Sequence, residues 1–277
     1  MVKFVVDSTF CLTREYAEAH DIRIVSLTLT LGDKEYVEGY SDEWGEFYRD
    51  YANGKNAAKT SQPSPKAFMN AVDEALGGSD DSEVIIMTIA ERLSGTIGSA
   101  KIAAMQYPEK KVAAIDSAQS GTSSLAFLRQ MIKARDEGMS FSELLAYAED
   151  LKGRVALQFI PASLTELARG GRVNKALSLI GNILKIKPVF EFANNSIQVY
   201  AKTLGMNKAI TAAIGRLPKK TDELFLTYIG DDKHIPQLKE RMLGEFGLSD
   251  IDVVPMCPVA GAHVGIGTVG IVSVASK

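Results

Sequence analysis

The sequence predicts an α/β protein of two domains, a layered domain with a parallel sheet followed by a smaller α+β domain. Short apolar runs alternate with helical patterns through the first half, which is typical of parallel strands joined by helices. In the second half, Asn194-Asn195 lies between two apolar runs and indicates an antiparallel hairpin. We place the boundary at the apolar run that begins near residue 155, which gives domains 1–155 and 156–277.

Capping residues and periodicity set the expected elements of the first half. Val2–Val6 forms a strand, and Thr13 begins a helix. The alternating run 24–31 is expected to be one strand, and Ser41 is expected to cap a helix with an aromatic stripe that packs in the core. Further helices are expected from Pro65, from Ile97, and over 121–136 and 140–151, with strands at 84–89 and 111–115.

The second half is expected to contain five strands, two helices and a flexible end. The strands cover 155–160, 186–192, 196–201, 223–229 and 250–255, and the helices cover 206–217 and 235–246. The final stretch, Gly261 to Val274, is rich in glycine around His263, and we expect a flexible apolar loop there.

Composition excludes several classes of protein. The chain of 277 residues is 46% hydrophobic and 23% charged, which suits a folded protein with a sizeable core. A formal net charge of −3 gives no broad basic field, so we expect no nucleic-acid partner. Cys11 and Cys257 have no metal spacing, and a reducing cytoplasm is the expected location. No apolar run is long enough for an integral membrane segment, so any membrane contact is expected to be transient.

Two stretches combine hydroxyl groups with the start of a helix. Thr60 and Ser61 precede Ser64, a good N-cap, and Pro65 at the first helical position. Hydroxyls and free amides at a helix N-terminus favour an anion, either phosphate or carboxylate. The simpler interpretation is an ordinary capped helix after a loop.

The second stretch is Ser94-Gly95-Thr96, which follows the buried strand 84–89. Ligands of open parallel sheets lie at the carboxyl ends of such strands, and Gly95 would let a ligand approach the backbone. We expect Ser94 to cap the helix that follows. Both hydroxyl stretches could then face one anion.

Several other polar residues are weaker candidates. Asp7, Ser8 and Ser117 follow strands and could line the site, or they could form turns held by bonds to the backbone. The lone His263 could be a ligand donor, a general base or a structural residue, and the glycines beside it favour a site. Arg169 and Arg172 could bind phosphate or lie on a solvated edge.

Taken together, these stretches resemble the DegV family, the fatty-acid-binding proteins of bacterial fatty acid kinase systems. The matching segments follow the family's order over the whole chain: Asp7-Ser8-Thr9, Thr60-Ser61-Gln62-Pro63-Ser64, Leu93-Ser94-Gly95-Thr96, Asp116-Ser117, Arg169-Gly170-Gly171-Arg172, Lys187-Pro188 and Gly261-Ala262-His263-Val264-Gly265. Two departures are visible: Ala262 and Ile266 occupy positions where the family often has proline, and the run 201–206 lacks the family's arginines.

The resemblance implies a DegV-like fold, with a three-layer N-terminal domain and one long-chain fatty acid in an apolar tunnel between or within the domains. It places the acyl tail in the N-terminal domain. The carboxylate would be held by Thr60 or Ser61 and by Ser94, with His263 nearby. A separate kinase subunit, which Arg169 and Arg172 could contact, would phosphorylate the bound acid. The protein would then be a carrier and not the catalyst, with the fatty acid as ligand and no cofactor.

An enzyme remains the alternative hypothesis. Ser94 and His263, with Asp116 or Asp7, could form the active site of a hydrolase or phosphotransferase that acts on an acyl substrate. No Gly-x-Ser-x-Gly elbow surrounds Ser94, and the sequence has no Walker loop and no spacing typical of metal ligands. We therefore favour the carrier.

Overall fold

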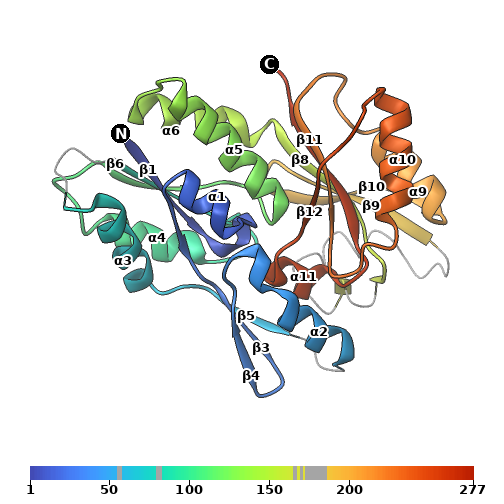
Figure 1. Cartoon of the computed structure of the whole chain (residues 1–277), viewed down its shortest axis with the longest axis horizontal. Helices are drawn as coiled ribbons and strands as arrows, with labels where there is room; N and C mark the ends of the chain where they lie inside the picture. The colour runs from blue at the N-terminus through green and yellow to red at the C-terminus, as the bar shows by residue number, and fades with distance from the viewer. Residues whose placement is uncertain (55–57, 79–82, 165–166, 169–170, 172–185) are drawn as a thin grey trace.

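The computed structural model describes residues 1–277 except 55–57, 79–82, 165–166, 169–170 and 172–185 (Figure 1). The described residues form two large sheets and one small sheet. The first sheet has four parallel strands in the order β2-β1-β6-β7, which confirms the parallel domain. Its strands are β1 (Val2–Asp7), β2 (Ile22–Val25), β6 (Glu83–Thr88) and β7 (Val112–Asp116).

Helices cover both faces of this sheet. On one face, α3 (Pro65–Leu76) and α4 (Thr96–Ala104) pack over Val5 and Ile86. On the other face, Phe4 and Met87 belong to a large core shared with α5 (Thr122–Asp136) and α6 (Phe141–Lys152). The short α1 (Arg14–Ala19) begins at Thr13, whose hydroxyl accepts the Tyr16 N–H at 3.1 Å.

The second sheet has six strands in the order β10-β9-β8-β13-β11-β12. Its strands are β8 (Val155–Ile160), β9 (Ile186–Ala193), β10 (Ser196–Leu204), β11 (Thr221–Tyr228), β12 (Val253–Pro255) and β13 (Val269–Ala275). The hairpin prediction is confirmed, because Asn194 and Asn195 adopt φ values of 49° and 57° between β9 and β10. The strand β13 has no counterpart among the expected elements.

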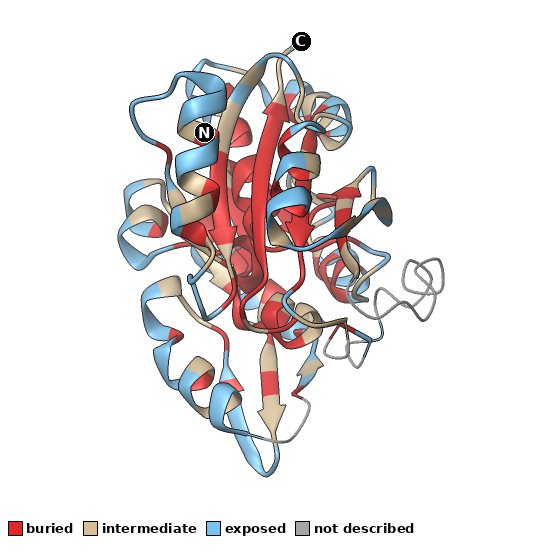
Figure 2. Ribbon diagram, turned by 90° about the vertical axis from the view of Figure 1, so that its right-hand side faces the viewer, coloured by how far each residue is buried: buried red, intermediate tan, exposed pale blue. Residues whose placement is uncertain are grey.

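The two large sheets lie on either side of α5, which contacts β8 and β13 as well as the 3-10 turn after β1. The inner face of the second sheet, including Val272 and Val274, shares the core of α5. Its outer face is covered by α9 (Met206–Ile214) and α10 (Ile235–Phe246). Figure 2 shows this layering, with buried strands at the centre and exposed helix surfaces outside.

The prediction of one strand over 24–31 is wrong. The chain leaves the parallel sheet at Val25 and joins a small antiparallel sheet at Thr28. The change is hidden in the sequence because buried residues continue to alternate through Leu27. The Leu27 N–H bonds to the Ser8 hydroxyl at 3.0 Å. The small sheet consists of β3 (Thr28–Leu31), β4 (Lys34–Val37) and β5 (Lys59–Ser61), and it projects from the body in Figure 1.

Two further expectations are corrected. Ser41 does not cap an α-helix, because it lies in a 3-10 turn and the N-cap position belongs to Tyr40. The following helix, α2, covers Gly45–Asn53. His263 does not lie in a flexible loop but in the helix α11 (Pro258–Val264). Its Gly261 serves close packing, since an added Cβ would lie 2.7 Å from the Tyr48 hydroxyl on α2.

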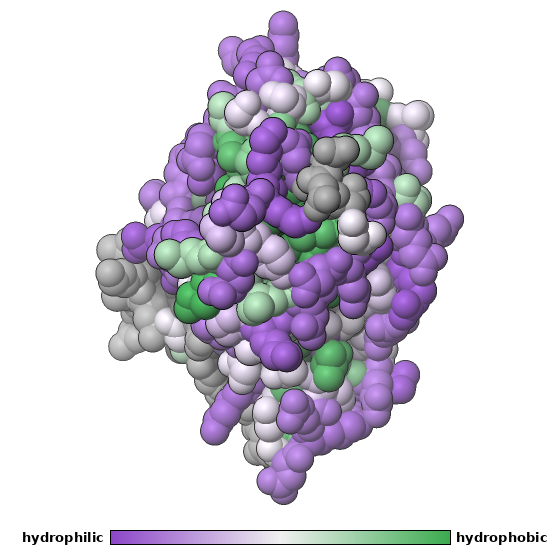
Figure 3. All heavy atoms as spheres, turned by 90° about the vertical axis from the view of Figure 1, so that its left-hand side faces the viewer, coloured by the Kyte–Doolittle hydropathy of each residue, from purple (hydrophilic) through white to green (hydrophobic). Residues whose placement is uncertain are grey.

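Among the described helices, none combines the length and the apolar character needed to cross a bilayer. The face shown in Figure 3 is mainly hydrophilic, with apolar residues scattered over it in small groups.

Candidate binding site

A cavity of about 230 Å³ lies where the two large sheets and α11 meet. One water needs roughly 10–15 Å³ of such space, so the cavity has room for a far larger ligand. Residues from both halves of the chain line it, which agrees with a tunnel between the domains, although the resemblance placed the acyl tail in the N-terminal domain. Its apolar walls include Leu27, Leu93, Leu157, Phe159, Phe192 and Met256.

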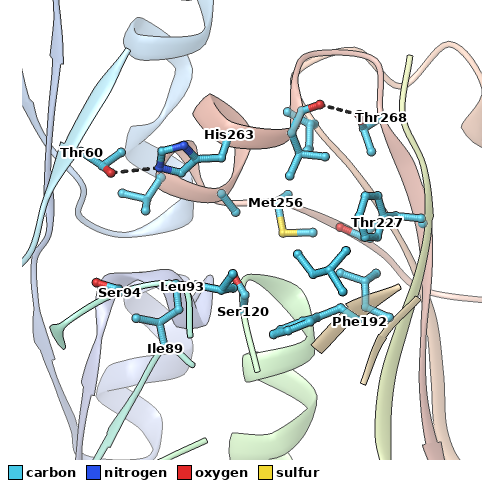
Figure 4. A pocket seen from close by; sticks show the side chains of 18 of the residues that line it. Thr60, Ile89, Leu93, Ser94, Ser120, Phe192, Thr227, Met256, His263 and Thr268 are labelled. Atoms are coloured by element: carbon cyan, nitrogen blue, oxygen red, sulfur yellow. Dashed lines mark hydrogen bonds between the residues drawn. The ribbon is translucent and has the colours of Figure 1, made fainter. Parts of the chain in front are cut away.

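Polar groups gather at one end of the cavity. Thr60 on β5 and His263 on α11 meet there, with 3.0 Å between Thr60 Oγ1 and His263 Nε2. In Figure 4 these two residues and Ser94 lie at one end, Phe192 and Thr227 lie at the other, and Met256 lies between them. The structure thus brings together the residues that the sequence predicted from three separate stretches.

Ser94 reaches the cavity without capping the helix as expected. The N-cap of α4 is Gly95, and it makes no side-chain capping bond. The Ser94 hydroxyl lies 2.8 Å from Thr96 Oγ1 and accepts the Thr96 N–H at 3.4 Å. Ser94 therefore belongs to a local hydroxyl pair, and it keeps a place in the cavity wall.

Gln62 joins the two hydroxyl stretches, a role that the sequence did not indicate. Its amide donates to the Ser99 hydroxyl on α4 at 3.2 Å. A Cβ on Gly95 would lie 2.4 Å from Gln62 Oε1, so the glycine leaves room for this side chain. Ser61, Gln62 and Gly95 also line the cavity, and all three are exposed, so the polar end opens to solvent.

The other predicted residues lie elsewhere. Thr96 is buried in the first turn of α4. Ser117 donates to the Thr88 carbonyl at 2.7 Å and accepts the Gln119 N–H at 3.1 Å, which is a turn held by backbone bonds. Arg169 and Arg172 lie outside the described residues. In the part of the chain that the structure describes, no group of three or more His, Cys, Asp or Glu residues could hold a metal ion.

Asp7 and Ser8 are fully buried and do not line the cavity, but each bonds to a group connected with its wall. Asp7 Oδ2 accepts the N–H of Ile89, a lining residue, at 2.7 Å. Ser8 Oγ donates to Glu38 Oε1 at 2.8 Å, and Glu38 Oε2 accepts the N–H of Val259 at 2.6 Å. No sequence pattern pointed to Glu38, because a glutamate after a strand and before Gly39 is typical of a surface turn.

Burial raises the pKa of both carboxyl groups. The pKa of Asp7 rises to about 6, although bonds from Thr9 and Ile89 oppose the shift. The pKa of Glu38 rises from 4.5 to about 8, with the nearby Asp7 adding to the shift. The folded state holds the Glu38 proton while the unfolded state releases it, so the free energy of unfolding falls as the pH rises from about 4.5 to about 8.

Comparison with known proteins decides the family. The family model described as "uncharacterised protein, DegV family" matches residues 1–276. The chain belongs to the DegV family. A DegV domain-containing protein of Staphylococcus aureus is 31% identical over 276 residues, covering 97% of this chain and 96% of that protein. The predicted resemblance is therefore confirmed.

Solved structures of DegV proteins share the fold. The structure on fatty acid binding by a DegV family protein from Thermus thermophilus matches with a TM-score of 0.88 and 26% identity, covering 99% of both chains. DegV from Bacillus subtilis, described as a fatty acid binding protein, matches with a TM-score of 0.82 and 26% identity, also covering 99% of both chains. The two-domain DegV-like fold predicted from the sequence is confirmed.

The far end of the cavity in this DegV family member contains a hydroxyl that costs stability. Thr227 is buried, and its Oγ1 has no hydrogen-bond partner among the described residues. We expect Thr227→Val to raise the free energy of unfolding by about 1 kcal/mol in urea denaturation, because an unpaired buried polar group is removed at constant shape. Thr268→Val is the matched control, since Thr268 Oγ1 donates to the Val264 carbonyl. Equal destabilisation of both variants would contradict this assignment.

Proposed function

We propose that this protein binds one long-chain fatty acid in the cavity and presents its carboxylate to a separate kinase subunit for acyl phosphate formation. The proposal rests on how polar and apolar side chains are distributed along the cavity. Hydroxyls and an imidazole lie at its open end, and the rest is lined mainly by apolar side chains, with a few hydroxyl residues such as Thr227 among them. The fatty-acid-binding DegV proteins of Thermus thermophilus and Bacillus subtilis support the same ligand class.

The energetics favour such a ligand. Burial of a 16-carbon chain at about 0.8 kcal/mol per methylene gains on the order of 10 kcal/mol before ordering costs. A carboxylate that leaves water without hydrogen bonds loses several kcal/mol. Thr60, Ser94 and His263 supply hydrogen-bonding groups at the place where the carboxylate would lie. The cavity therefore offers apolar walls to the acyl tail and hydrogen-bonding groups to the carboxylate.

The bound fatty acid would point its carboxylate toward solvent, which explains how a carrier could present it to a second protein. Ser61, Gln62 and Gly95 are exposed around the polar end, whereas Phe159 and Phe192 at the apolar walls are buried. A carboxylate at the open end is accessible to an external enzyme. In this proposal the protein acts in the cytoplasm and does not itself catalyse the phosphoryl transfer. Its two domains cover residues 1–155 and 156–277. Arg169 and Arg172 contact the kinase.

A hydrolase or phosphotransferase is the second candidate function, since Ser94 and His263 line one cavity. Two observations rank it lower. The Ser94 hydroxyl bonds to Thr96, and Asp7 bonds to Thr9 and to the backbone of Ile89, so both groups already have local partners. Beyond Thr60, Ser94 and His263, the described lining residues are apolar or neutral polar, and none of them is an aspartate or glutamate that could act with Ser94 and His263.

Mass spectrometry of the purified protein tests the proposal. Denaturing extraction should release a long-chain fatty acid in about equal amount to the protein, and the delipidated protein should bind palmitate again. The same preparation should turn over neither acyl esters nor ATP. Delipidated protein that binds no fatty acid would refute the carrier, and turnover that disappears in a Ser94→Ala variant would establish the enzyme.

A further inference from the structure

Glu38 is a buried carboxyl group behind the cavity wall. It follows β4 in the small sheet, and only 1% of its surface is exposed. Neither Lys nor Arg forms an ion pair with it among the described residues. Burial of an ionised carboxyl without a cation is costly, so burial favours the neutral form of Glu38, and the two hydrogen bonds that it accepts oppose this effect only in part.

These two bonds connect Glu38 to both sides of the polar end. Oε2 accepts the Val259 N–H in the first turn of α11, the helix that carries His263. Oε1 accepts from the Ser8 hydroxyl, which in turn accepts the N–H of Leu27, a lining residue. Glu38 therefore joins the wall at Leu27 to the helix that holds the imidazole.

We propose that Glu38 is a positioning residue for the carboxylate end of the cavity and that it binds a proton when the fatty acid is bound. This inference rests on the proposed function. A neutral Glu38 holds α11 in place and adds no negative charge behind the ligand's carboxylate. An ionised Glu38 repels that carboxylate, so the loss of the Glu38 proton weakens binding.

Titratable groups face Glu38 from several elements packed against it. They are Asp7 on β1, Cys11 after the following 3-10 turn, Tyr48 on α2 and Cys257 at the N-cap of α11. Asp7, with a pKa of about 6, is ionised above pH 7. Burial raises the pKa of Tyr48 and of Cys257 well above their ordinary values, so both stay neutral to pH 9. Glu38, with a pKa of about 8, changes charge between pH 7 and 9.

Glu38→Gln isolates this effect. The amide is uncharged at every pH and has an oxygen that can accept the Val259 N–H. We would measure the Kd for dodecanoate from pH 7 to 9 in the wild type and in the variant. The same ligand is measured with both proteins, so its own ionisation cancels from the ratio of their Kd values. The ratio of wild-type to variant Kd should be near one at pH 7 and rise about threefold to tenfold at pH 9.

Two more variants complete the test. Glu38→Ala removes both bonds and should weaken binding about tenfold relative to Glu38→Gln at every pH from 7 to 9, because neither variant carries a charge. Glu223→Gln is the matched control, because this largely buried glutamate bonds to Arg129 and Gln130, neither of which lines the cavity. It should keep the wild-type pH profile.

The outcomes separate the two proposals. Wild-type binding with a constant ratio between pH 7 and 9 would overturn the role of Glu38 and leave the proposed function intact. A pH profile in Glu223→Gln that matches Glu38→Gln would also overturn it, because the effect would then be general. Wild-type protein that binds no dodecanoate at pH 7 would refute both proposals.

Discussion

Replacement of Thr60 by valine together with Ser94 by alanine should weaken the binding of palmitate by about 10²- to 10⁴-fold. Each hydroxyl is expected to donate one hydrogen bond to the carboxylate, worth roughly 1.5–3 kcal/mol, and every 1.4 kcal/mol changes Kd tenfold. The fold should persist, because Ser94 is not the N-cap of α4 and valine matches the shape of Thr60. Isothermal titration of delipidated protein gives the affinities.

A fatty alcohol of the same length is the control for this double variant. It buries the same tail but carries no charge, so its affinity should change much less than that of the acid. Equal losses for acid and alcohol would mean that the two hydroxyls shape the cavity and do not bind the carboxylate. Unchanged affinity for the acid would remove both residues from the site and leave Ser61 and His263.

Gly121→Ala should destabilise the protein by about 2–6 kcal/mol in urea denaturation. Gly121 precedes α5 with φ 61° and ψ −134°, a conformation that costs other residues about 1–3 kcal/mol. An added Cβ would also lie 2.0 Å from Met256 Sδ, and overpacking costs about 1–3 kcal/mol more. Met256 lines the cavity, so fatty acid binding should weaken as well.

Two variants separate strain from overpacking. Gly138 has φ 96°, and the described residues leave open space around an added Cβ, so Gly138→Ala should show the strain alone. Met256→Ala combined with Gly121→Ala should give a favourable coupling energy of about 1–3 kcal/mol. Equal losses at Gly121 and Gly138, or no coupling with Met256, would contradict the predicted clash.

The periodic elements of the fold were predictable because their signals are local. Ser64 and Pro65 mark the start of α3, and Asn194-Asn195 marks the hairpin. The break at Leu27 was not predictable, because burial alternates on both sides of it and the deciding bond comes from Ser8, 19 residues away. Tertiary partners, and not the local pattern, end β2.

The sequence could predict those cavity residues whose side-chain chemistry and position at the end of a strand or the start of a helix both indicate a binding site. Hydroxyls after a buried strand or before a capped helix pointed to Ser94 and Thr60, and both line the cavity. His263 lines the cavity, but the sequence placed it in a flexible loop and not in α11, because glycine that serves close packing resembles glycine that serves flexibility. Glu38 was missed, since its partners Ser8 and Val259 are 30 and 221 residues away.

A crystal structure of the protein grown with palmitate tests the central claim most directly. We expect one acyl chain in the cavity, with its carboxylate within hydrogen-bonding distance of the Thr60 and Ser94 hydroxyls and its methyl end near Phe192. A palmitate bound outside this cavity, or one with its carboxylate beside Phe192 and its tail toward Thr60, would contradict the account.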